Sequence, residues 1–119
     1  MRAWTDAELH RLATASSLRL SAGSSDKVAV ELGMVLVAQN LFVRAFAGRR
    51  SRWFEAAATA GVGLIEVDGD VIPVRLEVSA GDDREIEAAY RARYGAAADL
   101  VSTRAARGAT LLITADSPR

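Results

Sequence analysis

Alternating hydrophobic and polar positions recur along the chain and predict strands. The alternation is cleanest over residues 71–78. The positions there that we expect to face a core are Ile72, Val74, Leu76 and Val78. Pro73 has the opposite parity and no backbone N–H, so this strand is expected at a sheet edge or at a bulge. Similar patterns predict five further strands, at residues 18–21, 27–38, 41–46, 62–67 and 109–114.

Helix signals lie in the segments between these strands. Thr5 can cap a first helix, because Glu8 stands at the reciprocal position of a capping box. Gly95 is expected to end a helix that begins after residue 82. A further short helix is expected over about residues 98–106.

Turn residues join neighbouring strands as hairpins. Gln39-Asn40 and Asp68-Gly69-Asp70 are both typical of tight hairpin turns, since these residue types tolerate positive φ. Strands joined by hairpins run antiparallel. The sequence therefore predicts an α+β protein, mainly β, with an antiparallel sheet or small barrel and helices on its outside.

The segment of residues 41–61, LFVRAFAGRRSRWFEAAATAG, carries the candidate chemistry. A predicted strand delivers Arg44, a turn follows with Arg49 and Arg50, and Ser51 can cap the next helix. Guanidinium groups and a helix N-terminus both attract anions. We therefore expect part of any anion site in this segment.

Aromatic side chains accompany these polar groups. Phe42 and Phe46 share the strand parity of Arg44, and Trp53 lies in the first turn of the following helix. An apolar groove lined by these three aromatic residues would suit a small organic molecule.

Each candidate also has a structural explanation. The stem of Arg44 can pack between phenylalanines while its head pairs with a structural acid. The turn arginines can be solvated, and Trp53 can anchor the core or an interface. Tyr90 and Tyr94 are typical of helix packing, with Arg93 extended along the surface beside them.

Composition narrows the function classes. The chain of 119 residues is long enough for one domain, residues 1–119, with a sizeable core. Fifteen basic residues balance fifteen acidic ones, so no net field favours nucleic acid or an acidic membrane. With no cysteine and one histidine, we expect neither thiol chemistry nor a metal site, and no pattern assigns a catalytic residue. The chain shows neither a signal peptide nor a membrane span, so a cytoplasmic protein is expected.

Several motifs together resemble a known family. They are the tryptophan-led first helix, the segment 41–61, the strand VIPVRLEVS at residues 71–79 and the sequence AAYRARYG at residues 88–95. The chain resembles a bacterial family of uncharacterised small proteins in the FMN-binding split-barrel superfamily, the relatives of pyridoxamine phosphate oxidase. Residues 45–78 are also similar to deazaflavin-dependent nitroreductases.

This resemblance implies a fold, a cofactor and a partner. It implies a six-stranded antiparallel split barrel with short helices packed outside, and a homodimer with cofactor grooves at the subunit interface. The positions that match the phosphate-holding residues of such relatives are Arg44, Arg49, Arg50, Ser51 and Trp53.

Two functions follow from these observations. The first is an oxidoreductase that holds FMN or a deazaflavin, whose cofactor carries the hydride chemistry on a small organic substrate. The alternative keeps the barrel without the cofactor, as a small-molecule binding module or cofactor-free enzyme that uses the groove of Phe42, Phe46 and Trp53. The nearly apolar strand before Arg44 favours the alternative.

Overall fold

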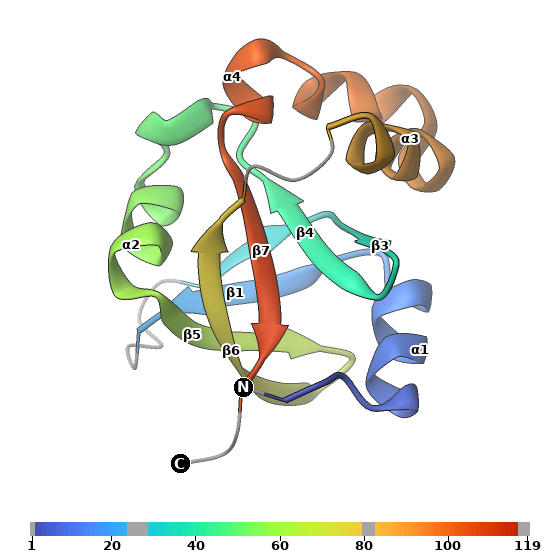
Figure 1. The fold of residues 1–119 in the computed structure, drawn as a ribbon, viewed down its shortest axis with the longest axis vertical. Coiled ribbons are helices and arrows are strands. Elements are labelled where there is room, and N and C mark those ends of the chain that lie inside the picture. The colour runs from blue at the N-terminus through green and yellow to red at the C-terminus, as the bar shows by residue number, and fades with distance from the viewer. Residues whose placement is uncertain (1, 24–28, 80–82, 117–119) are drawn as a thin grey trace.

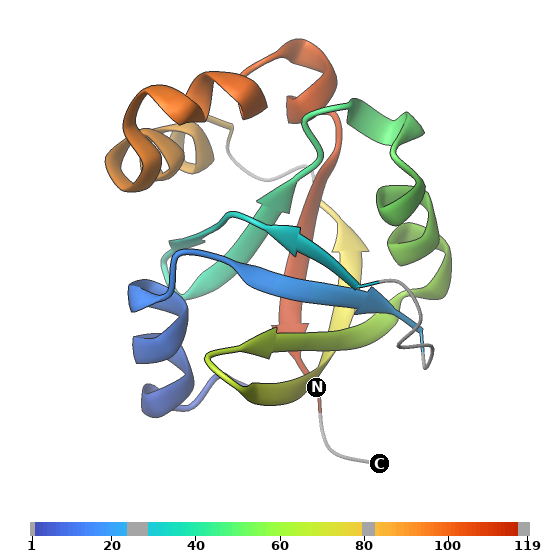
Figure 2. The same ribbon diagram turned by 180° about the vertical axis from the view of Figure 1, so that it is seen from behind.

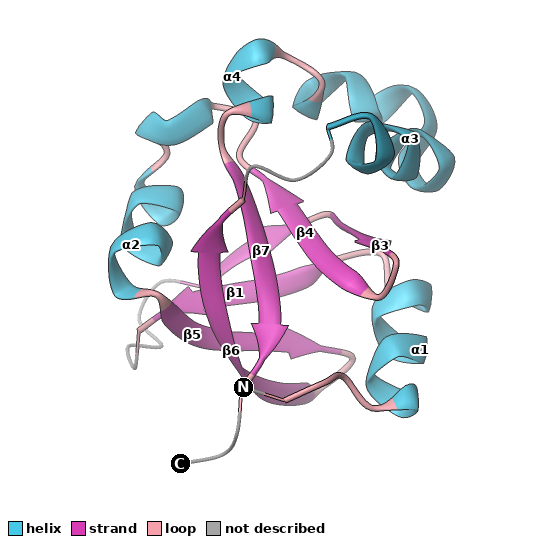
Figure 3. Cartoon of the chain, in the orientation of Figure 1, coloured by secondary structure: helices cyan, strands magenta, loops and turns pink. Residues whose placement is uncertain are grey.

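A computed structural model describes residues 2–23, 29–79 and 83–116, which form an α+β fold built on antiparallel strands (Figures 1 and 3). The strands are β1 (Leu18–Ala22), β2 (Ala29–Leu32), β3 (Met34–Val37), β4 (Asn40–Arg44), β5 (Val62–Val67), β6 (Asp70–Val78) and β7 (Thr110–Ala115). The α-helices are α1 (Asp6–Thr14), α2 (Arg52–Ala60), α3 (Asp83–Tyr94) and α4 (Arg104–Arg107), and two 3-10 helices are η1 (Gly48–Arg50) and η2 (Gly95–Val101).

The strands of the described chain make one sheet in the order β2-β1-β5-β6-β7-β4-β3, and every neighbouring pair is antiparallel. Figure 2 shows β1 and β5 crossing β4 and β7 at a steep angle, as in a strongly curled sheet. The two edge strands, β2 and β3, are consecutive in the chain and only Gly33 separates them. The sheet therefore curls into a half-barrel whose two edges meet at Gly33.

The division of one predicted strand explains why the described residues form seven strands and not the six expected. The strand predicted over residues 27–38 changes partner at Gly33: Leu32 pairs with Leu18 of β1, whereas Met34 pairs with Val43 of β4. A single straight strand cannot pair with both edges of a curled sheet, so the chain bends between them. Residues 27 and 28 lie outside the described part of the chain.

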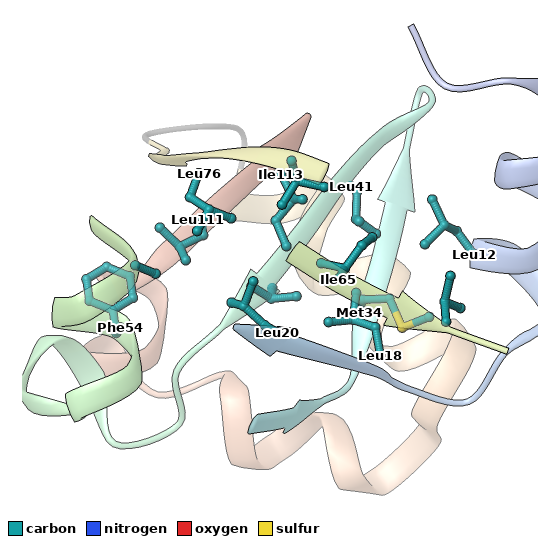
Figure 4. Close-up of a cluster of buried hydrophobic side chains, with 14 of the residues drawn as sticks. Leu12, Leu18, Leu20, Met34, Leu41, Phe54, Ile65, Leu76, Leu111 and Ile113 are labelled. Atoms are coloured by element: carbon teal, nitrogen blue, oxygen red, sulfur yellow. The ribbon is translucent and has the colours of Figure 1, made fainter. Parts of the chain in front are cut away.

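Alternation along β4 separates two hydrophobic clusters. Leu41 and Val43 face the inside of the half-barrel and join a large cluster that α1 and α2 close with Leu12 and Phe54 (Figure 4). Phe42, between them, faces outward and joins a smaller cluster under α3. The smaller cluster comprises Val35, Phe42, Ile86, Tyr90 and Ala98. β4 thus contributes side chains both to the interior of the half-barrel and to the cluster on which α3 packs.

Two sequence-based expectations about local structure are corrected. β6 lies between β5 and β7 and is not an edge strand, although Pro73 belongs to it. The β7 ladder reaches only to the pair Val74–Ala115, and beyond it the Pro73 carbonyl accepts from the N–H of Asp116 at 2.9 Å. Pro73 therefore lacks its N–H at a position beyond the end of the β7 ladder, where no strand hydrogen bond is lost.

The helix expected at residues 98–106 is instead the end of η2 followed by α4.

The start of α1 matches the predicted capping box. The N–H of Glu8 donates to the Thr5 hydroxyl at 3.1 Å, and the N–H of Thr5 donates to the Glu8 carboxylate at 2.8 Å. Arg2 holds the same carboxylate with two hydrogen bonds, 2.7 and 2.8 Å long. The hydrogen bond from Arg2 is the main reason that the pKa of Glu8 falls to about 2.

We predict that Thr5→Ala lowers the free energy of unfolding by about 1 kcal/mol, because the N–H of Glu8 loses its side-chain acceptor. Urea unfolding of both proteins measures this difference. Thr14→Ala is the matched control, since the Thr14 hydroxyl only donates to the carbonyl of His10 within the same helix. Equal losses for the two variants would contradict a specific role for the cap.

Candidate functional site

A pocket of about 490 Å³ opens where the two sheet edges part, and we call it the split pocket. It runs along β2, past Gly33 and the end of β4, to α3 and η2 on one side and the start of α2 on the other. Its apolar wall includes Val30, Leu32, Phe46, Trp53, Leu100 and Val101. The pocket therefore joins residues that lie far apart in the sequence.

The Tyr90 hydroxyl forms the base of the split. The β3–β4 register pairs Met34 with Val43, so the next pair would be Gly33 with Arg44. Instead, the N–H of Arg44 donates to the Tyr90 hydroxyl at 3.1 Å, and that hydroxyl donates to the carbonyl of Gly33 at 3.2 Å. A side-chain oxygen thus replaces a direct strand-to-strand hydrogen bond and holds the strands apart. Burial raises the pKa of Tyr90 further above neutrality, so the hydroxyl keeps the proton that this bridge requires.

Tyr94, one helical turn later on α3, secures the other side of Gly33. Its hydroxyl accepts from the N–H of Met34 at 2.8 Å and lies 3.0 Å from the carbonyl of Met34 and 3.1 Å from that of Ser16. A Cβ at position 33 would lie 3.1 Å from Cζ of Tyr94, closer than ordinary van der Waals contact. Gly33 is therefore needed for space beside the Tyr94 ring.

Arg44 is buried, with only 3% of the residue exposed, and its side chain contacts several protein groups. Nε donates to the Thr110 hydroxyl at 3.2 Å, and Nη1 donates to the carbonyl of Val101 at 3.2 Å. Nη1 also lies 3.9 Å from the carboxylate of Glu87, and Cζ lies 6.0 Å from the centre of the Tyr90 ring. These contacts make Arg44 the link between β4, β7, η2 and α3.

The structure brings only some of the predicted site residues together. Arg44, Ser51 and Trp53 line the split pocket, as does Phe46, a residue that is 69% exposed. The hydroxyl of Ser51 does not cap α2, although Ser51 occupies the N-cap position.

The remaining predicted residues lie elsewhere. Arg49 and Arg50 are exposed and do not border the pocket, and Nε of Arg49 donates to the carbonyl of Gly108 at 2.7 Å. Phe42 does not border the pocket either, because it is buried in the cluster that Ile86 and Tyr90 of α3 cover. The arginines of the turn and Arg44 therefore do not form one cluster around the pocket.

Sequence reasoning missed the two tyrosines and Leu100 as parts of the site. Tyr90 and Tyr94 line the pocket, and so does Leu100, which is 65% exposed. The spacing of four residues between the tyrosines places both hydroxyls on one face of α3. That spacing was a usable signal for a shared role of the two tyrosines. It could not show that their hydroxyls bind the backbone around Gly33, because pairing with strands distant in the sequence positions that backbone.

Among residues 2–23, 29–79 and 83–116, no three histidine, aspartate or glutamate side chains gather so that they could hold a metal ion. None of the helices described is long and apolar enough to cross a bilayer.

Fold and pocket together define a small α+β protein whose curled antiparallel sheet leaves a mainly apolar pocket at its split. Residues 8–113 match a family described as an uncharacterized protein conserved in bacteria (DUF2255), and the chain belongs to that family. The match includes all the pocket residues discussed above. A search of curated proteins found no match.

We predict that Tyr90→Phe lowers the free energy of unfolding by about 1–3 kcal/mol, because it leaves a buried N–H on Arg44 and a carbonyl on Gly33 without their bridge. Tyr94→Phe is the matched control, and it should cost less because Tyr94 is only partly buried and water can replace its hydroxyl. Urea unfolding monitored by circular dichroism measures both. A Tyr90→Phe protein as stable as the wild type would show that the bridge does not hold the split.

Proposed function

We propose that this protein binds a small, flat organic molecule in the split pocket. The observation that carries the proposal is the pocket itself, whose volume of about 490 Å³ lies in the range typical of small-molecule sites and whose walls are mainly apolar and aromatic. Phe46 and Leu100, both highly exposed, border its opening. A ligand seated there would remove these side chains from water and gain the corresponding hydrophobic free energy.

FMN or a deazaflavin is a specific candidate for this ligand. Such a cofactor would supply hydride chemistry, and the protein would then be an oxidoreductase. The half-barrel is compatible with a split barrel, and the aromatic walls suit a flat ring system. Ser51 borders the pocket at the N-terminus of α2, a favourable place for an anion.

The groups expected to hold the phosphate fit less well. Arg49 and Arg50 lie outside the pocket, and the Nε and Nη1 of Arg44 already donate to protein oxygens. The pocket thus suits the ring of such a cofactor better than its phosphate. This difference favours a binding module for a largely apolar molecule, the alternative inferred from the sequence.

We further propose that the protein is a homodimer. The exposed side chains of Phe46 and Leu100 border the same pocket, and a second subunit would cover apolar surface that is otherwise in contact with water. With this arrangement, the pocket would lie at or near the interface.

We predict that lumichrome, a flavin ring without its phosphate-bearing chain, binds the wild type and that Phe46→Ala weakens this binding by about 1–2 kcal/mol. Val71→Ala is the matched control, because Val71 is also highly exposed and does not border the pocket. Isothermal titration calorimetry measures the affinity, and a melting curve shows whether each variant keeps its fold.

FMN, titrated in parallel, separates the two candidate functions. Affinity for FMN well above that for lumichrome would support a phosphate site and the oxidoreductase. Equal affinities would support the binding module. Absence of lumichrome binding, or equal losses in Phe46→Ala and Val71→Ala, would contradict a ligand site in the split pocket.

We predict that light scattering at micromolar concentration gives about twice the chain mass of 12.6 kDa. Phe46→Ala combined with Leu100→Ala should shift the distribution toward monomer, because both substitutions remove exposed apolar side chains. A wild-type protein that is monomeric at this concentration would contradict the dimer.

A further inference from the structure

In the described sheet, the edge of β2 that lies opposite β1 forms one wall of the split pocket. Four consecutive residues border the pocket, from Val30 to Gly33. Side chains in a strand point alternately to opposite faces, so a single face would contribute only every second residue. A pocket bordered by residues of both parities must run along the edge of the strand, where backbone groups are accessible.

Two contacts of β1 show which of its backbone groups point toward β5. The N–H of Gly23 donates to the carbonyl of Val62 at 2.7 Å. A Cβ on Gly63 of β5 would collide with the carbonyl oxygen of Ser21, so that oxygen also points toward β5. Backbone groups alternate in direction along a strand, and therefore those of Leu18 and Leu20 point the other way, toward β2.

The register of β1 and β2 then fixes the backbone directions in β2. Leu18 pairs with Leu32 and Leu20 pairs with Val30, so the N–H and C=O groups of Val30 and Leu32 point toward β1. Those of Glu31, between them, point away from β1. Because β2 is an edge strand in the described sheet, the N–H and C=O of Glu31 face the split pocket and not another strand.

We propose that the backbone N–H and C=O of Glu31 recognise the ligand through an adjacent acceptor and donor on the edge of a flat heterocycle, as in a cyclic lactam. This inference rests on the proposed function. In an antiparallel ladder these two groups would pair with the C=O and N–H of one opposing residue. A lactam offers the same pair in a rigid ring, while the apolar walls contact its faces.

The geometry favours a small molecule over an added peptide strand. The Tyr90 hydroxyl donates to the carbonyl of Gly33, and the Tyr94 hydroxyl accepts from the N–H of Met34. These backbone groups, just beyond Glu31, are therefore not available to pair with an added strand. A peptide would obtain only a short run of backbone hydrogen bonds there, whereas strand addition depends on a continuous series of them. One oxygen of the Glu31 carboxylate, Oε2, accepts from the hydroxyl of Ser17 at 2.7 Å.

Proline substitutions test the backbone directions without any ligand. Glu31→Pro removes an N–H that points into the pocket, so the variant should fold with a melting temperature near that of the wild type. Val30→Pro removes an N–H that points toward β1 and should lower the melting temperature clearly more. The reverse order would overturn the proposal, because Glu31 would then face β1.

A pair of nearly isosteric probes tests the recognition itself. 2-Quinolone is a lactam with adjacent N–H and C=O groups, whereas coumarin is the corresponding lactone, in which an ester oxygen replaces the N–H. We expect 2-quinolone to bind about 5- to 10-fold more tightly, the effect of one net hydrogen bond. Glu31→Ala should retain this preference because its backbone is intact. Glu31→Pro should bind 2-quinolone about 5- to 10-fold more weakly than Glu31→Ala does.

Nuclear magnetic resonance locates the contact, since the amide of Glu31 should shift with 2-quinolone and less with coumarin. Equal affinity for both probes, or a loss of preference in Glu31→Ala, would overturn backbone recognition while the pocket remained a binding site. Failure of lumichrome and both probes to bind would overturn the proposed function and this inference together.

Discussion

The Tyr90 hydroxyl, inserted between Arg44 and Gly33, is the interaction on which the rest of the site depends. A curled sheet whose edges meet would ordinarily continue its hydrogen bonding across the join. Here one phenol oxygen accepts from one strand and donates to the other, so both backbone groups are satisfied while the strands separate. The free-energy cost of an unsatisfied buried amide is thereby avoided. A gap opens beyond the bridge, and side chains from α2, α3 and η2 enclose this gap.

Arg44 shows how the same region resolves a buried charge. A guanidinium removed from water is stabilised only when several acceptors surround it, and Thr110, Val101 and Glu87 lie near it here. These contacts join β4 to β7 and to the helices above the split. An arginine that is needed for this purpose has little capacity left to bind a phosphate. The structural role of Arg44, one of the two explanations open from the sequence, therefore accounts for its burial.

Local signals in the sequence predicted much of the fold, because local chemistry controls those features. Thr5 and Glu8 form a capping box from residues three apart, and the strand at residues 62–67 ends as its pattern indicates. The division at Gly33 was not predictable in this way. It depends on which strands lie opposite Leu32 and Met34, and on a tyrosine 57 residues away from Gly33. The candidate site was likewise predictable only in its local part. Ser51 and Trp53 follow Arg44 closely in the sequence, whereas the two tyrosines reach the pocket only through tertiary packing.

Residues that line the split pocket differ in how much they contribute to the stability of the fold. Residues at its base, Tyr90 and Arg44, also hold the sheet edges and the helices, so substitutions there alter stability as well as shape. Residues at its opening, Phe46 and Leu100, are exposed and contribute little to the core. The backbone of β2 lies between them and cannot be changed by most substitutions. Under the proposed binding function, variation at Phe46 and Leu100 would alter the size and shape of the molecule that fits, while Tyr90 and the edge of β2 would keep their hydrogen-bonding groups.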